Sequence, residues 1–158
     1  MTDNTLQMLN EVRLDALEKS KIRNPSKRIF DMIRTMCEAS LIAREKGLLA
    51  MEEHTFTAMP FVCDVGAALD LIVNVVPLDA SAEILTKRYW TRKFQDDGAL
   101  VYYLLTLSVL NIMKGINTRE LEELLLSNLP DETAKQYSEY ENANSQKGTV
   151  TILSERSG

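Results

Sequence analysis

The feature that most constrains the fold is one long apolar run, Ala99 to Met113, in which Thr106, Ser108 and Asn111 are the most polar residues. A helix that is apolar on every side has to be covered by other elements or by lipid. The run is shorter than the roughly 20 residues that a membrane-spanning helix needs. It therefore predicts a buried helix inside a larger domain, and we expect no transmembrane segment.

Helical signals recur along the rest of the chain. The 158 residues include only 6 glycines and 4 prolines, which favours helices. Asn24 before Pro25 is typical of a helix start, and Asn117 followed by Glu120 resembles a capping box. Gly115 suits the position just beyond a helix end. The expected helices span about residues 4–21, 25–54, 60–77, 79–96, 99–113, 117–129 and 131–140, with Asp79 as the cap of the fourth.

These helices predict an all-α, single-domain array of six to seven helices over residues 1–141. We expect the second, third and fifth helices to form the core. Gly47 lies inside the second helix, where glycine indicates either a bend or the close approach of another backbone. Residues 142–158 are polar with one short apolar patch, and they predict a disordered, flexible C-terminal tail.

Charge and composition exclude several classes of protein. Lysine and arginine total 18 against 23 acidic residues, so the net charge is -5, which argues against nucleic-acid binding. The first 20 residues contain no apolar signal segment, and we expect a cytoplasmic protein with Cys37 and Cys63 as packed thiols. Basic residues gather between Lys19 and Arg28, where they either complement a helix end or touch an acidic partner or lipid.

No recognisable catalytic motif is present in the sequence. It has no nucleophile elbow, phosphate-binding loop or zinc-spaced Cys/His set, and its one histidine, His54, directly follows two glutamates. We therefore expect no catalytic residue, cofactor or metal. A metal-dependent enzyme built on Asp64, Asp70 and Asp79 is the weakest hypothesis, because their spacings do not put three ligands on one helix face.

One segment carries a family resemblance. Residues 43–52, AREKGLLAME, are similar to the A-R-x-x-G-L-L-x-L-E signature of MotA, the stator subunit of the flagellar motor, in the MotA/TolQ/ExbB proton-channel family. The segment Pro60–Asp64, the apolar run Leu69–Val76 and the helix start near Asp79 follow in the family's order. Residues 29–97 thus resemble the cytoplasmic segment of a bacterial stator protein.

The resemblance implies a binding surface. In the stator family an arginine and a glutamate of this segment contact the rotor switch protein FliG, and they correspond to Arg44 and Glu52. On a continuous helix, eight residues place both side chains on nearly one face. With Glu45, Lys46 and Glu53 they would form a charged, partner-binding helix face. An ordinary solvated helix face explains the same residues equally well.

The departures from the family limit what the resemblance implies. Stator subunits have membrane helices on both sides of this segment, and none is expected here, so we do not expect proton conduction. The leading hypothesis is a non-enzymatic, cytoplasmic protein-interaction module that docks a rotor-type or other helical partner. The alternative is a helical homo-oligomer with a structural or regulatory role unrelated to motility.

Overall fold

A computed structural model describes residues 1–20, 27–53 and 62–157, without the side chains of residues 52, 53, 62, 63 and 145–157. The described residues contain helices and no strand, which confirms the all-α prediction. The helices are α1 (Asp3–Ser20), α2 (Lys27–Lys46), α3 (Ala50–Glu53), α4 (Val62–Val73), α5 (Leu78–Arg92), α6 (Asp97–Met113), α7 (Thr118–Leu126) and α8 (Asp131–Ser157).

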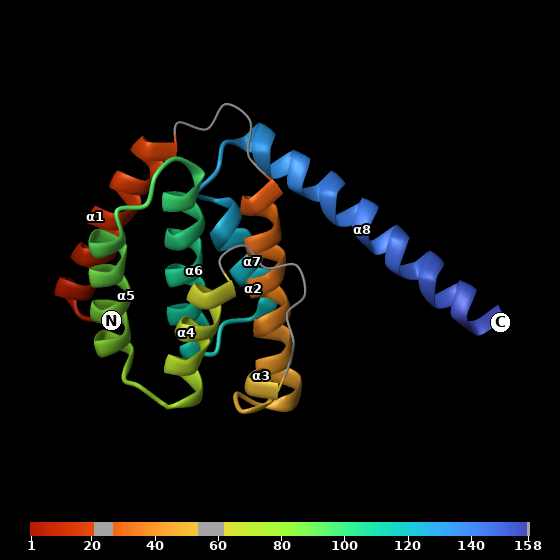
Figure 1. Ribbon diagram of the computed structural model, residues 1–158, viewed down its shortest axis with the longest axis horizontal. Coiled ribbons are helices and arrows are strands. Elements are labelled where there is room, and N and C mark those ends of the chain that lie inside the picture. Colours follow the sequence, from red (N-terminus) through yellow and green to blue (C-terminus); the bar gives the residue numbers. More distant parts are fainter. Residues whose placement is uncertain (21–26, 54–61, 158) are drawn as a thin grey trace.

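Helix α6 lies at the centre of the bundle, with α1 and α5 packed on one side of it and α2 and α7 on the other (Figure 1). Every residue from Gly98 to Thr106 is buried. Its buried polar side chains Thr106, Ser108 and Asn111 each donate to the carbonyl four residues earlier. Because these three side chains bond within the helix, they can lie among apolar neighbours without a partner from another element.

Three leucines with helical spacing in the helices that cover α6 are exposed. In α2, Phe30, Ile33 and Cys37 follow one another at steps of three and four residues and are buried, but Leu41, four residues further on, is exposed. In α1, Leu6 and Leu14 are exposed. The buried residues of α1 are instead Thr5, Leu9, Val12 and Ala16.

Asp79 was predicted to cap α5, and it does not. The helix begins at Leu78 with Pro77 before it, so Asp79 lies in the first turn and its carboxylate is turned toward the start of α1. Its Oδ1 accepts a hydrogen bond of 2.7 Å from the Thr5 hydroxyl and one of 3.4 Å from the Thr2 amide. These hydrogen bonds, that from Thr5 first, lower the pKa of Asp79. Asp79 therefore links α5 to α1 instead of capping the start of α5.

The last two helices follow the predicted starts. Asn117 caps α7 by accepting from the Arg119 amide at 2.8 Å, as predicted. Helix α8 is anchored on α2, where the rings of Tyr137 and Tyr140 pack against Phe30. It continues to Ser157, beyond the expected end near Tyr140, and projects from the bundle (Figure 1). The first residues of the tail predicted at 142–158 therefore belong to helix α8.

Cys37 is a buried thiol, as predicted, whereas the side chain of Cys63 lies outside the described residues. Burial raises the pKa of Cys37 to about 12, with the carboxylates of Glu122 and Glu141 adding to the effect. In a Cys63→Ser variant at pH 8, we expect the folded protein to react with a thiol reagent about a thousandfold more slowly than the unfolded chain. Equal rates with and without denaturant, followed by absorbance, would contradict a buried Cys37.

Candidate functional site

The end of α2 decides how the predicted binding residues are arranged. The helix stops at Lys46, and Gly47 follows with φ +93°, a left-handed conformation that favours glycine. A Cβ on Gly47 would meet no atom within 4 Å, so glycine serves the turn and not a close backbone approach. The expectation of a helix that continues to residue 54 is therefore wrong, because the chain turns at Gly47 before the short helix α3.

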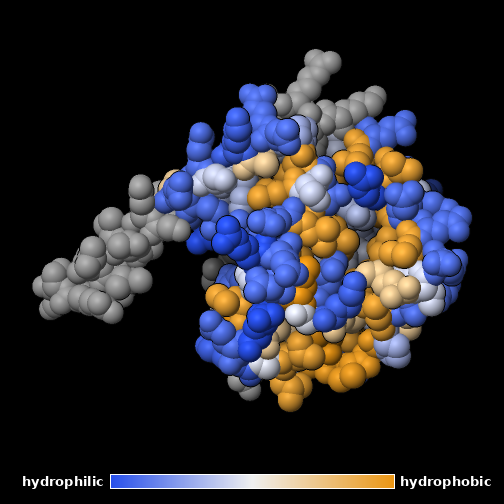
Figure 2. Space-filling model, turned by 180° about the vertical axis from the view of Figure 1, so that it is seen from behind, coloured by the Kyte–Doolittle hydropathy of each residue, from blue (hydrophilic) through white to orange (hydrophobic). Residues whose placement is uncertain are grey.

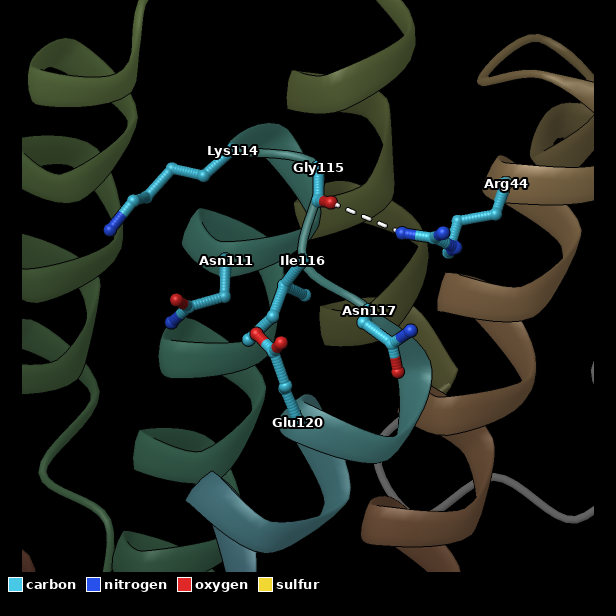
Figure 3. A pocket seen from close by; sticks show the side chains of 7 residues that line it. All are labelled: Arg44, Asn111, Lys114, Gly115, Ile116, Asn117 and Glu120. Carbon is cyan, nitrogen blue, oxygen red and sulfur yellow. Dashed lines mark hydrogen bonds between the residues drawn. The ribbon is translucent and has the colours of Figure 1, made fainter.

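Arg44 lies in the last turn of α2 and reaches across to the end of α6. Its Nη1 donates to the Gly115 carbonyl oxygen at 3.4 Å, as Figure 3 shows. Gly115 has φ +78° and follows the C-cap residue Lys114, which confirms its predicted position. A cation beside the carboxyl end of a helix is favourable, since the helix dipole leaves partial negative charge there.

A pocket of about 460 Å³ opens beside this contact. Arg44 and Lys114 supply positive charge to it, and Glu120 supplies a carboxylate. Figure 3 shows the Lys114 side chain extending away from the loop that joins α6 to α7. The remaining lining residues are Asn111, Gly115, Ile116 and Asn117. In the sequence Asn117 and Glu120 indicate only a helix start, because their closeness to Arg44 comes from the packing of α7 on α2.

The other predicted binding residues are only partly placed. Glu45 and Lys46 are exposed, and neither side chain has a partner among the residues that the structure describes. Glu52 and Glu53 belong to α3, but their side chains lie outside that description. The structure thus brings Arg44, Glu45 and Lys46 to one exposed helix end and separates them from Glu52 and Glu53 by the turn at Gly47.

The three aspartates of the weakest hypothesis are not gathered into one site. Asp64 is buried in α4 and forms an ion pair with Arg92, Asp79 bonds to α1, and Asp70 is exposed. Within the described ranges no group of three histidine, cysteine, aspartate or glutamate residues is placed to hold a metal ion.

The basic cluster at 19–28 is described only at its two ends. Lys19 pairs with Asp15 at 2.9 Å, and its ammonium group lies over the ring of Tyr89. Lys27 approaches Asp31 at 3.9 Å. Both lysines therefore have partners within their own helices, and residues 21–26 lie outside the described chain.

Comparisons with protein-family models, with curated proteins and with solved structures found no match to this chain. None of the helices in the described parts of the chain combines the length and the apolar composition needed to cross a bilayer.

Proposed function

We propose that this chain is a non-enzymatic protein-interaction module that docks a helical partner through the charged end of α2. The observation that carries the proposal is the exposure of Arg44, Glu45 and Lys46 together at this helix end, with Glu45 and Lys46 unpaired among the described residues. The resemblance to the stator segment makes the rotor switch protein FliG the first partner to test.

The chemistry of this helix end suits recognition of a charged surface. Arg44 presents a planar donor fork, Lys46 a single ammonium group, and Glu45 a carboxylate between them. Exposed charges of both signs select a partner with the opposite pattern and speed its approach, more than they tighten the complex. Arg44 is also held in place by the Gly115 carbonyl, so part of the cost of ordering its side chain is already met in the free protein.

The test is binding to purified FliG, measured by calorimetry or by a pull-down assay. Arg44→Glu is expected to weaken binding about tenfold or more, because it reverses one of the two positive charges of the helix end. Glu52→Lys, alone and combined with Arg44→Glu, shows whether α3 belongs to the same surface. Lys135→Glu is the matched control, since Lys135 is an exposed lysine of α8 away from α2's end.

The thermal midpoint of each variant shows whether it is folded. The Arg44 side chain makes one exposed contact, so its reversal is expected to shift the midpoint by only a few degrees. No binding of the folded wild type, or binding that Arg44→Glu and Lys135→Glu reduce equally, would remove FliG as the partner recognised by this helix end.

A further inference from the structure

A small apolar pocket lies at the end of the bundle where α2, α4 and α6 finish and α5 begins. Its volume is about 190 Å³, and it is lined by Leu48, Ile72, Met113 and the segment Val75–Leu78. Leu49, which follows Leu48 in the chain, is 69% exposed. Figure 2 shows apolar side chains gathered over this end, the lower end in both views. We call this surface the end pocket.

Val75 is strained and exposed at the rim of the end pocket. Its φ is +55°, a conformation that a β-branched residue rarely adopts, and its side chain is 80% exposed. It follows α4, where the Val75 amide donates to the Ile72 carbonyl and the Val76 amide to the Leu71 carbonyl. Gly115 occupies the equivalent place after α6 with φ +78°. In the isolated chain, Val75 has a strained backbone and a side chain that is not buried. An apolar contact with another molecule would bury that side chain.

Helix α1 presents a matching surface elsewhere on the same chain. Asp3, Leu6, Asn10, Leu14 and Glu18 are three or four residues apart, so they share one face, and all five are exposed. The two leucines, each about half exposed, lie about 12 Å apart along the helix. A helix with apolar anchors at such spacing is the kind that enters an apolar groove on a partner. We call this surface the α1 face.

Lysines lie close in the chain to two residues of the end pocket, and carboxylates lie on the α1 face. Lys46 precedes Leu48 by two residues and Lys114 directly follows Met113, and both lysine side chains are exposed without a partner among the described residues. The carboxylate of Asp79, beside Leu78, already accepts hydrogen bonds from α1 of its own chain. The α1 face instead carries carboxylates at both ends, Asp3 and Glu18. Opposite charges at the rim favour this pairing over other apolar contacts.

We propose that the end pocket of one molecule receives the α1 face of a second copy of the same chain. One of the two leucines enters the pocket, and the other packs against the exposed Val75 and Leu49. A symmetric contact between two end pockets is disfavoured, because it would bring the same lysines together. A lipid surface would cover the exposed Val75 and Leu49 but leave the concave part of the pocket empty, whereas a leucine side chain fills it. The contact joins two different surfaces, so it is head-to-tail.

Self-association measured by light scattering over a wide range of protein concentration tests the proposal. The wild type is expected to associate, and Leu14→Asp or Val75→Asp to weaken association about tenfold or more. Leu41→Asp is the matched control, because Leu41 is an exposed leucine of α2 outside both surfaces. Val75→Gly is expected to weaken association while it raises the thermal midpoint by about 3 °C, because glycine relieves the positive φ.

Mixing the two aspartate variants separates this head-to-tail contact from a symmetric one. Leu14→Asp retains a wild-type end pocket and Val75→Asp retains a wild-type α1 face, so the mixture is expected to form a dimer that neither variant forms alone. A monomeric wild type, a mixture that stays monomeric, or a monomer that binds anionic lipid vesicles would overturn the proposal. The inference does not rest on FliG binding, because its variants leave Arg44, Glu45 and Lys46 unchanged.

Discussion

Replacing Leu104 with alanine is expected to lower the free energy of unfolding by about 3 kcal/mol. Leu104 is fully buried in α6, the helix against which α1, α2, α4, α5 and α7 pack. Truncation removes apolar contacts on all sides and leaves a cavity that the surrounding helices fill only in part. Urea unfolding followed by circular dichroism measures the loss, which corresponds to a drop of about 10 °C in the thermal midpoint for a chain of this length.

Leu41→Ala is the control for this prediction. It makes the same chemical change on α2, where the leucine is exposed, and is expected to cost less than about 1 kcal/mol. The slope of the free energy with urea concentration should stay the same in both variants, since neither alters the surface that unfolding exposes. Equal losses in the two variants would contradict the central position of α6.

Arg92→Met is expected to cost about 2 kcal/mol, the second large effect. Arg92 at the end of α5 forms an ion pair with Asp64 in the first turn of α4, and the Asp64 side chain is only 7% exposed. Removal of the guanidinium leaves a buried carboxylate without its cation, which is more costly than the pair itself is favourable. The loss stays below that of a fully buried pair because Arg92 is 45% exposed and water can partly replace it.

A double-mutant cycle identifies the cause of that loss. Asp64→Asn combined with Arg92→Met removes the uncompensated charge, so the double variant is expected to be more stable than Arg92→Met alone. Lys93→Met is the control, since Lys93 follows Arg92 and is exposed. If the effects of Asp64→Asn and Arg92→Met simply add, the two side chains are not coupled.

Features that depend on a few neighbouring residues could be predicted from the sequence. The start of α7 at Asn117 and the turn at Gly115 were predicted correctly, because capping and positive φ are decided within one helical turn. The burial of α6 was also predictable, because a helix that is apolar on every side has no polar face that could be exposed to water. Gly47 is the exception, because it ends α2 by a positive φ, which is a local property that the expectation of a helix to residue 54 passed over.

Features that depend on neighbours distant in the chain could not be predicted. Asp79 was expected as a helix cap, and it bonds instead to Thr5, 74 residues away in the chain. Leu6, Leu14 and Leu41 fit apolar stripes by spacing, yet they are exposed, because the positions of the neighbouring helices decide which side of each helix is covered.

The sequence by itself determined that this chain is helical, where most of its helices begin, and which helix is buried. Those properties follow from capping, periodicity and the hydrophobic effect acting within one segment. Only the tertiary structure decided that Arg44 reaches Gly115, and that Leu48, Val75 and Met113 share one pocket. Such contacts depend on how helices of given length and stripe width pack around α6, and no local pattern encodes that arrangement.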